Sequence, residues 1–142
     1  MRIFLDSSVI LSACGSDRSL SSLVALIAKE QGWQMVSAAY CRAETLKNLS
    51  KFPQAASSRW QDFQARVEWT PNALTTPRPI LLTASKDKPV LISALAAECD
   101  ALLTLDTGDF GILLGSKVYG LKVMTPRSFL IERGLVQSGR GT

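Results

Sequence analysis

Two aspartates stand directly after two of the most apolar segments of this chain. Asp6 follows the apolar run 3–5, and Asp106 follows the run 102–105. Short apolar runs of this kind are typical of buried strands. If the two strands run parallel, both carboxylates emerge at the same edge of the sheet, where α/β proteins form their sites. Carboxylates gathered at one edge can hold a divalent cation or transfer protons.

Two further acids are brought to this edge by predicted helices. A helix from Pro89 leads into the 101–105 strand and must run antiparallel to the sheet, so Asp87, just before it, lies at the same edge. Glu44 lies one or two turns into the helix that follows the 33–36 strand, within about 10 Å of that helix start. Asp109, three residues after Asp106, is a fifth candidate.

Each acid also has an ordinary structural interpretation. Asp87 could cap the following helix, because Asp is a favoured N-cap residue. Asp6 and Asp106 could form turns after their strands, as could Asp109 beside Gly108. Glu44 could face solvent on an amphipathic helix. These alternatives stay open for each residue taken alone.

The acids taken together favour a metal site. Two unit charges ~4 Å apart repel by about 4 kcal/mol at an effective dielectric near 20. A cluster of three or four is therefore costly unless protonation, basic side chains or a cation relieves it. Lys86 and Lys88 flank Asp87 and could supply part of that relief. A site built from oxygen ligands suits Mg²⁺ or Mn²⁺.

Composition narrows the chemistry further. The chain has 142 residues, no histidine, three cysteines and a formal net charge of +4. Without imidazole there is no Ser-His-Asp or Cys-His triad, no HExxH zinc site and no histidine base. The cysteines at 14, 41 and 99 form no CxxC pair, which fits a reduced, cytoplasmic protein. The positive charge slightly favours a polyanionic partner.

The length predicts a single domain, which we place at residues 1–136, followed by a tail at 137–142 that we expect to fray. No run approaches the ~20 apolar residues of a membrane span. The apolar start of the chain reaches Asp6 too early for a signal-peptide core. We therefore expect a cytoplasmic protein that does not contact a membrane.

Hydrophobic spacing places strands and helices alternately along the chain. For example, Leu20, Leu23 and Ile27 share one helical stripe that ends before Gly32. Strands are expected at 3–5, 33–36, 101–105 and 122–124, with a further short one at 80–82, and helices at 19–30, 38–49, 53–67, 89–97 and 125–133. This alternation predicts an α/β fold, a three-layer α/β/α sandwich with a short, mostly parallel central sheet.

The residues around the acids resemble one known family. The segment 6–10 (DSSVI) is similar to the opening motif of PIN domains, and Glu44 in 43–46 (AETL) is similar to their helical acid. The segments 86–91 (KDKPVL) and 101–110 (ALLTLDTGDF) resemble the second half of the family, as does the ending 120–130. The resemblance covers nearly the whole chain.

This resemblance implies a metal-dependent ribonuclease, most often the VapC-like toxin of a toxin–antitoxin pair. Such toxins typically form homodimers and are blocked by a small antitoxin protein. The implied catalytic and metal-binding residues are Asp6, Glu44, Asp87 and Asp106. Asp109 would be an additional metal-binding acid, and Ser8 and Thr104 would be supporting hydroxyls.

Hydrolysis of RNA by a metal-activated water needs no histidine. Basic residues near the site would bind the phosphates, and the candidates are Arg42, Lys47, Lys86 and Lys88, each also an ordinary surface charge. Tyr40, Trp60 and Trp69 could stack on bases or pack in the core.

Three other functions remain open. The same nuclease could act in RNA processing or decay without a toxin role. A non-catalytic PIN-like module could bind RNA or protein. A haloacid-dehalogenase-like phosphatase expects a second Asp two residues after the first, where this chain has Ser8.

Overall fold

A computed structural model describes residues 1–73, 88–108, 110, 111 and 113–137 of the chain. Along the sequence its elements are β1 (Arg2–Leu5), α1 (Ser7–Gly15), α2 (Leu20–Gln31), β2 (Gln34–Ala38), α3 (Ala39–Leu49), α4 (Ala55–Ala65), β3 (Val67–Thr70), α5 (Lys88–Ala96), β4 (Ala101–Leu103), β5 (Lys117–Val118), β6 (Leu121–Met124) and α6 (Pro126–Glu132).

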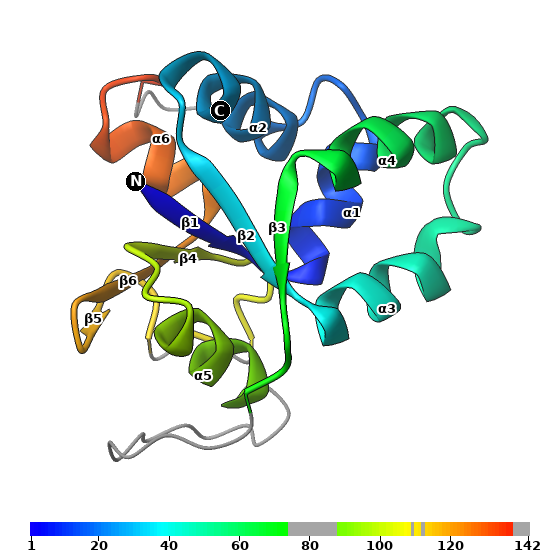
Figure 1. The fold of residues 1–142 in the computed structure, drawn as a ribbon. Helices are drawn as coiled ribbons and strands as arrows, with labels where there is room; N and C mark the ends of the chain where they lie inside the picture. Colours follow the sequence, from blue (N-terminus) through cyan, green and yellow to red (C-terminus); the bar gives the residue numbers. More distant parts are fainter. Residues whose placement is uncertain (74–87, 109, 112, 138–142) are drawn as a thin grey trace.

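The strands form one sheet in the order β3-β2-β1-β4-β6-β5 (Figure 1). Neighbouring strands run parallel, except that β5 pairs antiparallel with β6 at the edge. Ile3 in β1 stands beside Met35 of β2 and Ala101 of β4. This register confirms the predicted parallel pairing of the two strands that precede Asp6 and Asp106.

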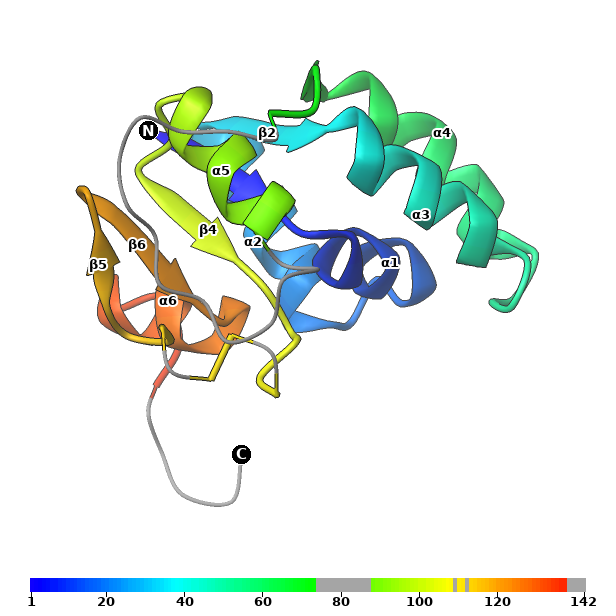
Figure 2. The same ribbon diagram turned by 90° about the horizontal axis from the view of Figure 1, so that it is seen from below.

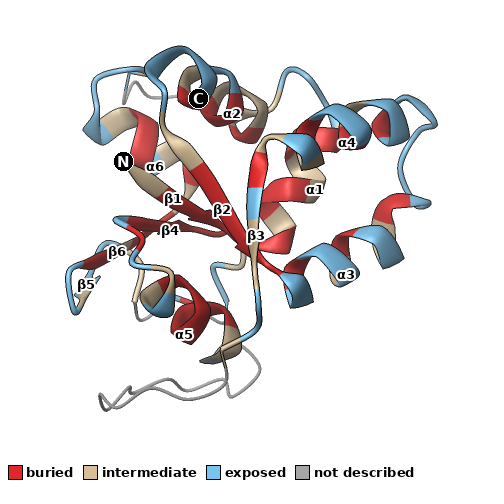
Figure 3. Ribbon diagram, viewed as in Figure 1, coloured by how far each residue is buried: buried red, intermediate tan, exposed pale blue. Residues whose placement is uncertain are grey.

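Helices cover both faces of the sheet, so the predicted three-layer sandwich is confirmed. Because side chains alternate along a strand, Ile3 and Leu5 point to one face and Phe4 to the other. The first face packs against α1, α2 and α6, and the second against α5 and the segment around Phe110. Figure 3 shows the central strands buried between these layers. Helices α3 and α4 both contact α1, and they lie on the right-hand side of the molecule in Figure 2.

The strand order leaves a crevice at the end of β1 and β4. The chain leaves β1 for β2 on one side, and it leaves β4 for β5 and then β6 on the other side. The two connections therefore diverge outside the carboxyl ends of these strands, which is where ligands bind in open α/β sheets. The Asp6 N–H donates to the Leu103 carbonyl at 3.1 Å and holds the two strand ends together.

Several element boundaries differ from those expected. Helix α1 was not predicted, and the helix expected over 53–67 ends at Ala65, after which Val67 starts β3. Strand β4 ends at Leu103, two residues before the predicted end, and β5 was also not predicted. The strand expected at 80–82 and residues 138–142 of the predicted tail lie outside the described residues.

Across the described part of the chain, no single helix is both long and apolar enough to cross a membrane. Helices α1 and α2 reach that length only together, and a bend of 94° separates them.

Candidate functional site

Asp6 is held in the site by hydrogen bonds from three neighbouring groups. It follows β1 and caps the N-terminus of α1 from an extended backbone conformation. Its Oδ1 accepts a hydrogen bond from the Ser7 N–H at 2.8 Å, and its Oδ2 accepts from Ser8 Oγ at 3.0 Å and Thr104 Oγ1 at 2.8 Å. Only 8% of the residue is exposed. The strand end, the helix start and the partner strand therefore hold this carboxylate in one orientation.

The hydroxyls that contact Asp6 also hold the turn after β4. Thr104 Oγ1 accepts from the Asp106 N–H at 3.0 Å, and Ser8 Oγ accepts from the Leu105 N–H at 3.1 Å. Both residues expected as supporting hydroxyls thus connect Asp6 to the segment that carries Asp106. The hydroxyls of Ser8 and Thr104 therefore contact both Asp6 and the backbone that carries Asp106.

Glu44 reaches the same place from α3. Its Oε1 accepts from Ser7 Oγ at 2.7 Å, so two consecutive serines at the start of α1 contact two different acids. Ser7 was not predicted as a site residue. The direction in which its side chain points depends on α1, which was not predicted either. Tyr40, one turn earlier in α3, has a raised pKa, because of burial first and then a hydrogen bond to Glu44.

These acids line one small cavity, which we call the acid pocket. It has a volume of about 270 Å³ and is lined by Asp6, Ser7, Ser8, Leu11, Tyr40, Glu44, Val90 and Asp106. Three carboxylates from separate parts of the sequence therefore share it, and its lining among the described residues includes no Lys or Arg. Val90 places the first turn of α5 at its wall.

Charge in this pocket is incompletely compensated. Burial raises the pKa of Asp6, although hydrogen bonds from Thr104, Ser8 and the Ser7 N–H oppose that change, and the charge of Glu44 raises it further. The ionised form therefore loses more from leaving water than it regains from its donors. A bound cation would relieve this cost, and carboxylate and hydroxyl oxygens are donors that suit Mg²⁺ or Mn²⁺.

Part of the expected site falls outside the described residues. Asp87, Lys86 and Asp109 are among these, and Lys88 begins α5 without a described side chain. Among the residues that are described, no group of three or more His, Cys, Asp or Glu side chains could hold a metal ion.

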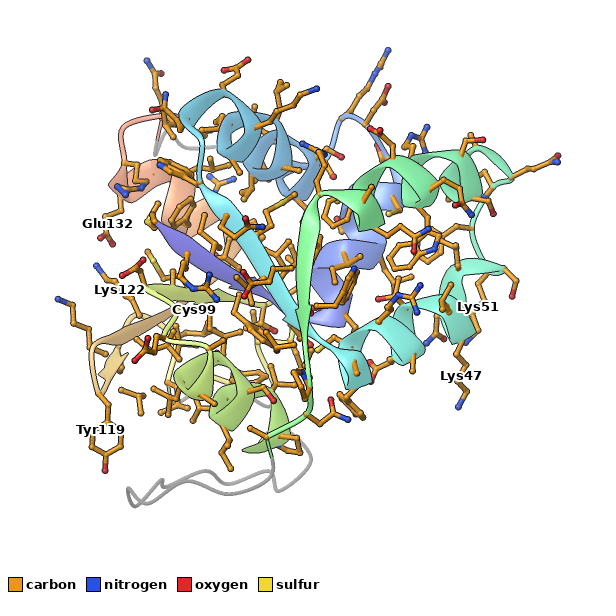
Figure 4. The ribbon with its side chains drawn as sticks, in the orientation of Figure 1. Lys47, Lys51, Cys99, Tyr119, Lys122 and Glu132 are labelled. Atoms are coloured by element: carbon orange, nitrogen blue, oxygen red, sulfur yellow. The ribbon has the colours of Figure 1, made fainter. Side chains whose placement is uncertain are left out.

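Two basic candidates do not line the acid pocket. Arg42 lies two residues before Glu44, ~200° around α3, and its side chain lines a second cavity. Lys47 is exposed near the C-terminal end of α3 and points away from the body of the fold (Figure 4). Helical rotation therefore turns Arg42 to another side of α3 from Glu44, and its role in binding phosphates stays a prediction.

The three aromatic candidates have different environments. Trp60 is 2% exposed and packs in the core, which confirms the structural interpretation for this residue. Tyr40 is 41% exposed and lines the acid pocket. Trp69 is partly buried and lines the same cavity as Arg42.

The sheet order, its covering helices and the crevice at β1 and β4 define a PIN-like α/β/α fold. No family model matches the chain, and no curated protein matches it. The chain is similar to one in the crystal structure of VapBC2 from Rickettsia felis bound to a DNA fragment from their promoter. The TM-score is 0.60 at 13% sequence identity, over 88% of this chain and 98% of that chain. This likeness establishes the fold.

Proposed function

We propose that this protein is a Mg²⁺- or Mn²⁺-dependent endoribonuclease and the toxin of a VapBC-type toxin–antitoxin pair. The observation that carries the proposal is the acid pocket, in which Asp6, Glu44 and Asp106 meet without a basic neighbour among its described lining. The likeness to a chain of VapBC2 supports the toxin class. Asp87 and Asp109 are proposed to complete the set of acids.

The roles of the residues follow from their contacts. Asp6, Glu44 and Asp106 would hold the ion only together with Asp87 and Asp109, and Asp6 would be kept in place by Ser8 and Thr104. When bound, such an ion supplies a water of lowered pKa and offsets negative charge on phosphate oxygens. The carboxylates cannot attract a phosphodiester by themselves, so RNA binding depends on basic residues outside the pocket. We assign this role to Arg42, Lys47, Lys86 and Lys88.

A matched pair of substitutions tests the catalytic role. Glu44→Gln removes one charge from the acid pocket, and Glu30→Gln removes one from the exposed face of α2. We expect Glu44→Gln to lower the rate of Mg²⁺- or Mn²⁺-dependent cleavage of a mixed RNA pool by about tenfold to a hundredfold. Glu30→Gln should cleave like the wild type. Undiminished cleavage in excess EDTA would refute the proposed mechanism.

The toxin role requires a separate measurement. Expression of the wild type should arrest growth of a bacterial host, and expression of Glu44→Gln at the same level should not. The proposed partners are RNA, a small antitoxin protein and a second copy of the chain, and sedimentation of the purified protein tests the dimer. Metal-dependent cleavage without growth arrest would favour a nuclease of RNA processing or decay over a toxin.

A further inference from the structure

A second cavity, which we call the arginine pocket, lies between the start of α3, the C-terminal half of α4 and β3. Its volume is about 570 Å³, roughly twice that of the acid pocket. Its lining includes the guanidinium of Arg42, the indole of Trp69 and the amides of Gln61 and Gln64. Cationic, aromatic and amide groups therefore surround one open space.

The indole in this pocket is fixed. The Trp69 Nε1–H donates to the Gln64 carbonyl at 3.1 Å, and its ring packs against Trp60 at a centroid distance of 5.8 Å. Because Trp60 is buried in the core, Trp69 has a rigid support on one side. The ring is held in place before any ligand arrives, so little conformational entropy would be lost on stacking.

The polar groups around the indole are also ordered. The Arg42 Cζ lies 5.8 Å from the centre of the Trp69 ring, and its Nη2 donates to Gln64 Oε1 at 3.1 Å. Gln64 Nε2 in turn donates to Gln61 Oε1 at 3.0 Å. This chain of contacts leaves the Gln61 amide group at the exposed end and holds the charged guanidinium of Arg42 over the ring of Trp69. An aromatic face next to an arginine is the combination that binds unpaired nucleobases and their phosphates.

The arginine pocket and the acid pocket adjoin each other along the chain. Ala39 lines the arginine pocket and Tyr40 lines the acid pocket, and both belong to the first turn of α3. The Tyr40 N–H donates to Asn72 Oδ1 at 2.7 Å, which fixes this turn against the segment after β3. A single extended strand could therefore occupy both pockets by passing over one helical turn.

We propose that the arginine pocket binds an unpaired nucleobase of the RNA substrate next to the phosphodiester in the acid pocket. The base stacks on Trp69 in place of Arg42, and the guanidinium of Arg42 moves to the adjoining phosphate. This inference rests on the proposed ribonuclease function. It gives the enzyme a preference for single-stranded RNA, because a paired base cannot reach the indole.

The chain contains a natural control for this pair of residues. Arg133 lies over Trp33 at 4.8 Å, so it too is an exposed arginine on a partly buried tryptophan. Trp33, however, packs edge-on against Phe129 of α6 and supports the core rather than the arginine pocket. Substitution of Arg42 or of Arg133 removes the same charge and the same type of contact.

Binding of uridine and adenosine RNA hexamers in EDTA, measured by fluorescence anisotropy, tests the proposal without cleavage. We expect Trp69→Leu to weaken binding roughly five- to hundredfold, which is the range for one stacked base. Arg42→Gln should weaken binding and reduce the slope of log affinity against log salt by about 0.7, and Arg133→Gln should change neither. A hexamer of abasic ribose phosphates should bind the wild type and Trp69→Leu equally.

Three outcomes would overturn the inference: equal losses in Arg42→Gln and Arg133→Gln, a loss in Trp69→Leu that is the same for the abasic hexamer, or wild-type affinity in both pocket variants. Arg42 is exposed, so Arg42→Gln tests the pocket even if Trp69→Leu fails to fold. If the wild type cleaves RNA with metal but Trp69→Leu and Arg42→Gln bind RNA like the wild type, the role of the arginine pocket is rejected and the nuclease function stands. If these two variants bind RNA more weakly but the wild type does not cleave RNA with any metal tested, the nuclease function is rejected and the binding role of the arginine pocket is supported.

Discussion

Replacing Thr104 with valine removes one hydroxyl from the site and nearly preserves the shape of the side chain. Thr104 is fully buried, and its hydroxyl donates to Asp6 Oδ2 at 2.8 Å and accepts from the Asp106 N–H at 3.0 Å. The bond to a charged group contributes about 1.5–3 kcal/mol, and the bond from the part-buried Asp106 N–H contributes about 0.5–1.5 kcal/mol. Because neighbouring contacts relax, we expect Thr104→Val to lower the free energy of unfolding by about 2–4 kcal/mol.

Three further variants, Thr104→Ser, Asp6→Asn and the double variant of Asp6→Asn with Thr104→Val, separate the hydrogen bonds from packing. Thr104→Ser keeps the hydroxyl and loses one methyl group, which costs about 1 kcal/mol. In an Asp6→Asn background the hydroxyl no longer faces a charge, so Thr104→Val should cost less there. The double-mutant cycle should give a coupling energy of about 1 kcal/mol or more between the two positions.

Urea unfolding at pH 7 in EDTA, followed by circular dichroism, measures the wild type and all four variants under one condition. A cost for Thr104→Val no larger than that for Thr104→Ser would show that the hydroxyl contributes nothing. A coupling energy near zero would show that Thr104 does not act through Asp6. Either result would refute the account of an acid held in place by its neighbours.

The pKa of Asp6 is raised by burial, so its charge costs stability at pH 7, and this cost disappears as the pH falls through the folded pKa. Asp6→Asn should therefore stabilise the metal-free protein at pH 7, with a smaller difference near pH 4. Added Mg²⁺ should raise the melting temperature of this variant less than that of the wild type. A less stable variant, or equal melting shifts, would contradict this prediction. Burial raises the pKa of Cys14 and of Cys41 to about 11 and that of Cys99 to about 12. The unfolded chain loses these protons first, so the free energy of unfolding should fall above pH ~9 by up to about 1.4 kcal/mol per pH unit for each thiol. Replacing all three with alanine should remove this slope, and fast thiol labelling of the folded protein at pH 8 would contradict their burial.

Local patterns predicted much of the architecture. The helical stripe before Gly32 predicted α2, and the apolar runs before Asp6 and Asp106 predicted β1 and β4, because these signals lie within a few neighbouring residues. Helix α1 gave no such signal. It is packed against the sheet, α3 and α4, so its residues do not divide into an apolar and a polar face. Strand β3 begins directly after α4, with no turn residues to mark the boundary.

Residue types and chain order decided that this protein has acids at strand ends, no histidine and a carboxylate chemistry suited to a divalent cation. Only the tertiary structure decided which of these acids share a pocket, because the order of strands in a sheet depends on packing between distant segments. Placing β1 beside β4 brings Asp6 and Asp106 together, and the rotation of α3 turns Glu44 toward them and Arg42 toward the neighbouring pocket. The link from Ser7 to Glu44 likewise exists only after two helices have packed.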